Sequence, residues 1–126
     1  RGMIRRSGIG FDLRYFRKQL KMSQSNLAAL LGVGRTTYGA WEKHEAPPWI
    51  ELACRGLRAS LVFPAISSPM SATEMIRARK QLGLSQDELA SELGISRHTI
   101  SRLENGQPHQ WIGYALIALA VTFNTG

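Results

Sequence analysis

Residues 84–106 read LSQDELASELGISRHTISRLENG. Ser85 and Glu88 have the Ser-x-x-Glu spacing of a capping box, which predicts that a short helix begins directly after Ser85. Gly94 suits the left-handed residue that ends such a helix, and Ser96 can cap the next one. The stretch therefore predicts two short helices joined by a tight turn.

The chain repeats this plan, because an earlier copy lies 62 residues upstream. From Phe11 to Leu57, 17 of the 47 residues are identical to the residue 62 positions later, with no gap. The length of 126 residues fits two such units. We expect a basic arm at 1–10, a first domain at 11–61, an apolar, proline-containing linker at 62–70 and a second domain at 71–126.

Both copies predict helices only, since no stretch has the alternating pattern of a strand. In the first copy we expect helices at 11–21, 24–31, 35–44 and 49–61. A further capping box, Ser71 with Glu74, opens the second copy. Its third helix is expected to end at Gly106, and its fourth to run from about Gln110 to about Phe123. Two short helices joined by a Leu-Gly-apolar turn are typical of a helix-turn-helix motif.

Three segments carry a family resemblance: LSQDELA at 84–90, GISR at 94–97 and ISRLENG at 100–106. They closely resemble the XRE family, the Cro and lambda-repressor type of regulator, and the resemblance covers residues 71–119. Residues 11–57 are a weaker match, and the segment 43–45 departs from the Asn-Gly ending of the family. The resemblance implies an all-α chain of two tandem lambda-repressor-like domains, each with four to five helices. It also implies binding of double-stranded DNA through the third helix of each copy.

The third helix of the second copy must bury Ile100 and Leu103, so its opposite face points outward. That face holds the residues that match the base-reading positions of the family: Arg97, His98, Ser101 and Arg102. The equivalent face of the first copy offers fewer donors, with Arg35, Thr36 and Ala40 as expected base contacts. The alternative for both helices is a solvated polar face.

Contacts to DNA phosphates are expected mainly from the first copy, because the charge is concentrated there. The net charge is +7, and residues 1–62 hold 11 basic and 4 acidic side chains against 5 and 5 in residues 63–126. The resemblance implies phosphate contacts from Gln24, Gln86, Lys43 and Asn105, helped at the two glutamines by a helix N-terminus. Arg5 and Arg6 could enter a minor groove, unless the arm is only a tail.

Two ion pairs, Arg17 with Glu42 and Arg79 with Glu104, match the partly buried pair that ties the first helix of the family to its third. Both copies keep both partners at the same spacing, so a structural role is expected for them. Unrelated surface charges are the alternative.

The last helix, residues 111–123, carries no charge, and a helix that is apolar on all sides should be buried on all sides. The first copy, a second chain or another protein could cover it, and we favour a homodimer. The residues expected at such a contact, between chains or between copies, are Trp111, Ile112, Tyr114, Leu116, Ile117, Val121 and Phe123. The linker permits two arrangements. In one, the copies form a pseudo-dimer and read the two halves of one operator. In the other, a homodimer centres on one copy and the second copy extends the footprint along the duplex.

Several classes of function are disfavoured by the sequence. The three histidines, His44, His98 and His109, have no metal-ligand spacing with one another or with Cys54. Neither a nucleophile elbow nor a glycine-rich phosphate loop occurs, so we expect no enzyme, no cofactor and no metal. No signal peptide or membrane span is predicted. We expect a cytoplasmic protein, bacterial or phage-encoded and nucleoid-associated.

The preferred interpretation is a sequence-specific transcriptional regulator, a repressor that inserts recognition helices into the major groove of an operator. The alternative is a protein-interaction module or antitoxin-like adaptor that uses the apolar last helix, with DNA binding secondary. The sequence does not identify a protein partner.

Overall fold

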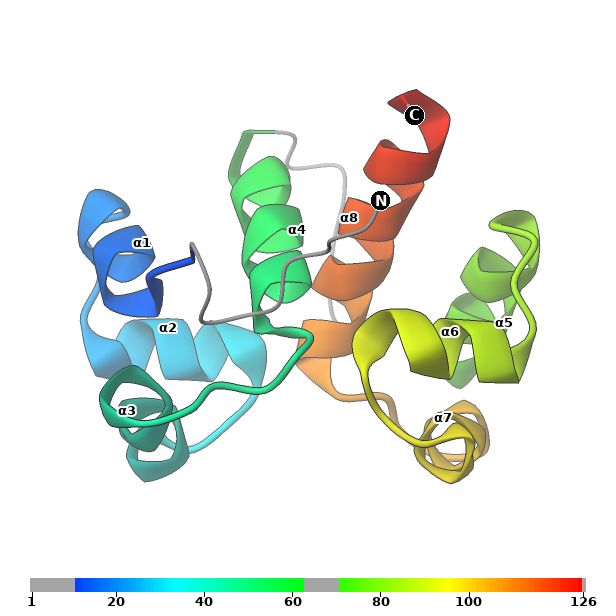
Figure 1. Cartoon of the computed structure of the whole chain (residues 1–126), viewed down its shortest axis with the longest axis horizontal. Coiled ribbons are helices and arrows are strands. Elements are labelled where there is room, and N and C mark those ends of the chain that lie inside the picture. The colour runs from blue at the N-terminus through cyan, green and yellow to red at the C-terminus, as the bar shows by residue number, and fades with distance from the viewer. Residues whose placement is uncertain (1–10, 63–70, 126) are drawn as a thin grey trace.

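The computed structural model describes residues 11–62 and 71–125, which form eight helices and no strand (Figure 1). The first copy contains α1 (Leu13–Gln19), α2 (Gln24–Leu31), α3 (Arg35–Lys43) and α4 (Ile50–Val62). The second contains α5 (Ala72–Gln81), α6 (Gln86–Leu93), α7 (Arg97–Glu104) and α8 (Gln110–Thr125). The prediction of an all-α chain with two tandem copies is confirmed. Helix α4 extends through Val62, one residue into the predicted linker.

Side-chain hydrogen bonds start most of these helices. Ser71 and Ser85 each accept a hydrogen bond from the backbone N–H three residues later. In return, Glu74 and Glu88 each accept one from the backbone N–H of the serine, so both predicted capping boxes are present. In the first copy, α3 begins after Gly34, which has no side chain to act as a cap.

The turns between the second and third helices depend on glycine. Gly32 and Gly94 end α2 and α6 with φ angles of 80° and 72°, in the left-handed region that glycine adopts without strain. Helix α7 ends at Glu104 with Asn105 as its C-cap, so the predicted stop, Gly106, lies two residues past the last helical residue. The backbone N–H and the side chain of Asn105 both donate to the carbonyl oxygen of Ser101.

Lys21 is a non-glycine residue in the left-handed region, with a φ of 58°, while its equivalent, Gly83, has a φ of 76°. This conformation costs a residue with a Cβ about 1–2 kcal/mol. We therefore expect Lys21→Gly to raise the free energy of unfolding by about 1 kcal/mol. Gly83→Lys should lower it by a similar amount, because a Cβ there meets no atom within 4 Å and only the backbone is strained. Urea unfolding of both variants checks this, and changes of the same sign would contradict it.

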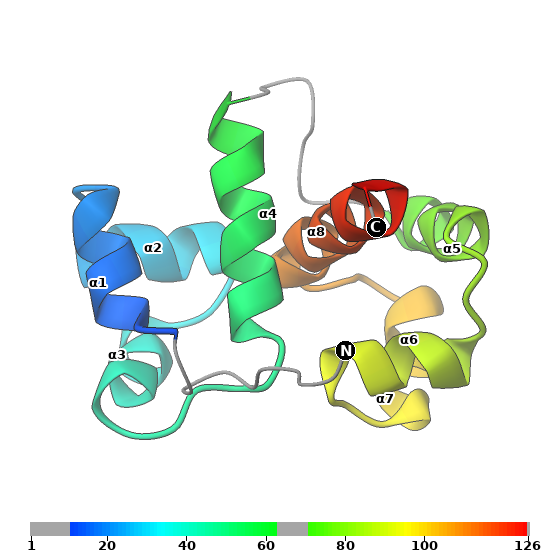
Figure 2. The same ribbon diagram turned by 45° about the horizontal axis from the view of Figure 1, so that its top comes forward.

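The two copies pack against each other through their last helices. Figures 1 and 2 show α4 and α8 next to each other at the centre, with α1–α3 on one side and α5–α7 on the other. Both helices contribute fully or almost fully buried side chains to one continuous core: Ile50, Ala53, Cys54, Leu57, Ile112, Ala115, Leu116 and Leu119.

The approach of α4 to α8 is very close at Gly56. A Cβ built on Gly56 would overlap the backbone carbonyl oxygen of Tyr114, so only glycine permits this crossing. At the start of the same helices, the rings of Trp49 and Trp111 stack with centroids 3.7 Å apart. Trp41 lies edge-on to Trp49 at 5.5 Å, which extends the aromatic contact towards α3.

Helix α4 of the same chain covers the apolar last helix. The side chains of Trp111, Ile112, Tyr114 and Leu116 are buried without a second chain. Ile117 is half-buried and Val121 is 50% exposed, while the side chain of Phe123 lies outside the described part of the structure. The reason for favouring a homodimer contact at this helix is therefore removed. Among the described helices, none has both the length and the apolar character that crossing a membrane requires.

Candidate nucleic-acid interface

The third helices of the two copies lie on one side of the molecule. Figure 1 shows α3 and α7 at the same lower edge, one on each side of the central pair, and Figure 2 shows the same relation after rotation. The two helices predicted to touch bases thus lie on the same side of the molecule, although they are far apart in the sequence.

The orientation of α7 is fixed by its buried residues. Ile100 is fully buried and Leu103 is 6% exposed, which turns the opposite face towards solvent. On that face Arg97, His98 and Arg102 are exposed and Ser101 is half-buried. Arg97 approaches Asp87 with 3.8 Å between Nε and Oδ1, and since both side chains are mostly exposed this pair is weak. These side chains therefore remain accessible to a ligand.

Helix α3 presents fewer polar groups on its equivalent face. Tyr38 is fully buried and fixes the orientation, so that Arg35, Thr36 and Ala40 are exposed. Lys43, at the end of the helix, is exposed as well. The first copy thus offers two cations and small side chains, where the second offers several longer hydrogen-bonding side chains.

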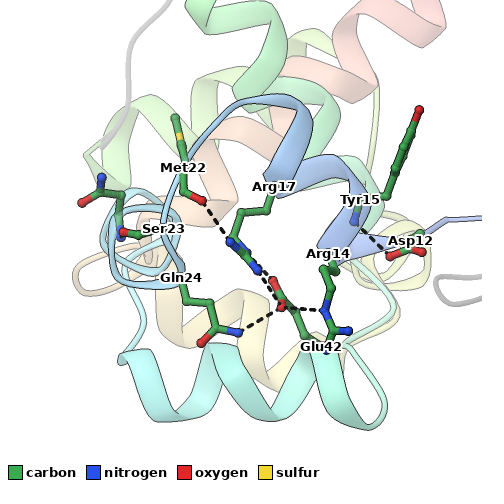
Figure 3. A network of polar contacts seen from close by, with 9 residues as sticks. Asp12, Arg14, Tyr15, Arg17, Met22, Ser23, Gln24 and Glu42 are labelled. Atoms are coloured by element: carbon green, nitrogen blue, oxygen red, sulfur yellow. Dashed lines mark hydrogen bonds and ion pairs between the residues drawn. The ribbon is translucent and has the colours of Figure 1, made fainter.

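A buried carboxylate joins the first three helices of the first copy (Figure 3). The Nε of Arg17 donates to Oε2 of Glu42 at 2.7 Å, and its Nη2 donates to Oε1 at 3.2 Å. The remaining guanidinium nitrogen, Nη1, donates to the carbonyl oxygen of Met22 at 3.0 Å. Gln24 and Arg14 also donate to Oε1 of Glu42, at 3.0 and 3.4 Å. The Glu42 side chain has no exposed surface, so these donors replace water around its charge.

The second copy repeats this network except for the Arg14 contact, because Ile76 stands at the position equivalent to Arg14. Arg79 donates to Glu104 at 2.6 and 3.2 Å, and to the carbonyl oxygen of Leu84 at 2.9 Å. Gln86 donates to Oε1 of Glu104 at 2.9 Å. Each network runs from the first helix to the third, so the predicted ion-pair partners meet and fix the helix that carries the candidate base-reading residues.

The Glu42 pKa reflects two opposing effects. Burial alone would raise the pKa of this carboxyl, but hydrogen bonds from Arg17 and Gln24 outweigh burial and hold the pKa at about 2. The same hydrogen bond to Glu42 raises the pKa of the Arg17 guanidinium. In the folded chain, the Glu42 carboxyl group is therefore ionised at moderate pH.

Acid should destabilise the protein through Glu42. The folded pKa lies below the unfolded one of about 4.3, so the carboxylate stabilises the fold above that pH. This contribution is lost as the pH falls from about 4.5 towards about 2. We expect the free energy of unfolding to drop in this window, and Glu42→Gln to show a smaller drop. Urea unfolding at several pH values measures both, and parallel curves would count against this role for Glu42.

The residues predicted to bind phosphates differ in their surroundings. Gln24 and Gln86 are half-buried, and each directs one amide N–H at the carboxylate of its own copy, a role that the sequence reasoning missed. Asn105 donates from its side chain to the carbonyl oxygen of Ser101 at 2.9 Å. Arg5 and Arg6 lie outside the described residues. The signal for the glutamine contact was available, because glutamine recurs at the same distance from glutamate in both copies.

No metal site is formed within residues 11–62 and 71–125, where no three His, Cys, Asp or Glu side chains lie close enough to bind one ion. Cys54 is fully buried, and burial raises the pKa of its thiol to about 12. The thiol therefore stays protonated at neutral pH.

Comparison with protein families assigns the fold to a known group. A family model described as helix-turn-helix matches the chain twice, at residues 13–53 and 75–110, which together exceed half of its length. Neither the curated proteins nor the solved structures yielded a match. Each matched segment contains the second and third helices of one copy, with the turn between them. The chain therefore belongs to the XRE-type helix-turn-helix family of DNA-binding regulators and carries two tandem copies of its domain.

Proposed function

We propose that the protein is a sequence-specific transcriptional regulator that inserts α7 and α3 into the major groove of double-stranded DNA. The outward face of α7 carries this proposal. It combines Arg97 and Arg102, which can pair bidentately with guanine, with the shorter donors His98 and Ser101. The buried Arg79–Glu104 pair holds this helix rigidly, as base reading requires.

Phosphate contacts would position the protein without reading sequence. Lys43 is exposed at the end of α3, where it would face the DNA backbone. Gln24 and Gln86 begin α2 and α6, where backbone N–H groups favour an anion. An amide has two N–H donors, and the carboxylate uses one of them, so the other remains for a phosphate oxygen.

We propose repression rather than activation, because a protein bound across a promoter excludes other proteins by occupancy alone. The adaptor alternative depended on an uncovered apolar last helix, and it loses that support because α4 packs on α8. The bacterial or phage origin stays a prediction.

Replacement of Arg102 tests base reading. Arg102→Ala should weaken binding to a duplex selected from a random library by about 5- to 150-fold, the range for one good bidentate contact. It should change binding to random DNA far less. Fluorescence anisotropy on both duplexes at one salt concentration measures this.

The matched control is Arg77→Ala, which removes the same charge from an exposed position on α5, outside the proposed surface. It should affect both duplexes little and equally. If Arg102→Ala weakened the affinity for selected and random DNA equally, Arg102 would not be a base-reading residue. Binding that does not weaken with added salt would contradict the whole proposal, since phosphate contacts impose a steep salt dependence.

A further inference from the structure

The contact between the two copies is close to two-fold symmetric, although one chain forms both sides. Trp49 and Trp111 occupy equivalent positions of the repeat. Their rings stack with centroids 3.7 Å apart and planes 6° apart. A residue that meets its own equivalent lies on the axis of an isologous contact, the kind that identical subunits make.

A second pair of contacts occurs twice with the copies exchanged. A Cβ built on Gly32 would lie 3.0 Å from Cβ of Gln110, and one built on Gly94 would lie 2.5 Å from Cγ of Pro48. Gly32 is equivalent to Gly94, and Pro48 to Gln110. The same two positions therefore meet on both sides of the axis, as they do in a symmetric dimer.

This contact is a packed core and not a flexible tether. Gly56 lets α4 approach the backbone of Tyr114, and the side chains around the crossing are buried in one cluster with the cores of both copies. The two copies are therefore fixed relative to each other. The rigid contact keeps α3 and α7 on one side of the molecule, as Figure 1 shows.

The two surfaces that this symmetry places together are chemically unequal. Arg35 and Arg97 are identical, but the other outward positions differ. Thr36, Gly39 and Ala40 of the first copy stand where the second has His98, Ser101 and Arg102. A symmetric dimer of identical chains with one copy each would present the same reading surface twice, and so could not present these two different surfaces.

We propose that a single chain is a complete two-sided DNA reader, and that its operator has two half-sites of different sequence. The inference rests on the proposed function, sequence-specific binding of duplex DNA. A symmetric dimer reads a palindrome because its halves are identical. Here the two half-sites should share the base opposite Arg35 and Arg97 and differ opposite the three other positions.

The experiment exchanges one reading surface for the other. The triple variant Thr36→His, Gly39→Ser, Ala40→Arg gives α3 the outward residues of α7 without touching a fully buried side chain. Sequences bound by the full wild-type chain and by the variant are selected from a random duplex library. Native mass spectrometry then counts chains per duplex.

We expect an asymmetric site for the wild-type chain and a palindrome of the second half-site for the variant, each bound by one chain. The variant should bind that palindrome at least about 10-fold more tightly than the wild-type chain does, within the range for changed base contacts. Circular dichroism confirms that the variant is folded. Arg102→Ala provides an independent check, because it should relax the selected bases in one half-site only.

Two outcomes would overturn the inference while leaving the proposed function intact: a palindromic wild-type site with two chains on it, or a single half-site. If no sequence is enriched at all, the proposed function itself fails.

Discussion

Gly56→Ala should lower the free energy of unfolding by about 3 kcal/mol, the upper part of the usual range for overpacking a core. The added methyl group would overlap the carbonyl oxygen of Tyr114, which belongs to the backbone and cannot rotate away. Helices α4 and α8 would have to separate and expose part of their shared core. Urea unfolding followed by circular dichroism measures the loss.

Gly39→Ala is the matched control, since it makes the same change inside helix α3. A Cβ at Gly39 would lie 3.7 Å from Oε1 of Gln24, an ordinary contact. Alanine favours a helix over glycine by about 0.5–1 kcal/mol, so this variant should be as stable as the parent or more so. If Gly56→Ala and Gly39→Ala changed the free energy of unfolding equally, this would contradict the close approach of α4 to α8 at Gly56.

Glu104→Ala should lower the free energy of unfolding by about 3–5 kcal/mol, because it leaves the buried Arg79 guanidinium without its counter-charge. Only 11% of the Arg79 side chain and 4% of the Glu104 side chain are exposed, so water cannot replace the lost carboxylate. Asp87→Ala serves as the control. It removes the exposed partner of Arg97 and should change stability by less than about 1 kcal/mol.

A double variant separates the cost of a stranded charge from the value of the pair. Arg79→Met combined with Glu104→Leu removes both charges, so it should be less destabilised than Glu104→Ala alone. The single variants Arg79→Met and Glu104→Leu complete the comparison. If the double variant lowered the free energy of unfolding by as much as these two single variants added together, the network would act through something other than paired charge.

Much of the fold could be predicted because its signals are local. The capping boxes at Ser71 and Ser85 and the helix stop at Gly94 depend on residues within a few positions of one another. Helix α7 ends two residues before Gly106 because Asn105 already leaves the helical conformation, and a glycine marks a helix end only to within a residue or two. The outward face of α7 followed from the burial of Ile100 and Leu103.

The contact between the copies could not be predicted in the same way. A charge-free helix must be covered, but its composition does not identify the cover. The first copy, a second chain and another protein were all possible packing partners for residues 111–123. The sequence analysis favoured a second chain, whereas in the structure α4 of the same chain packs there. The decisive residue, Gly56, has no distinguishing local pattern, because its role depends on a backbone 58 positions away in the sequence, at Tyr114.

The most direct test of the account is a guanine methylation-protection footprint on the selected operator, with the number of chains counted on the same complex. The rigid α4–α8 contact predicts that one chain protects two successive major grooves on one face of the duplex, about one helical turn apart. One chain that protects a single groove, or two chains that are needed for two grooves, would contradict it.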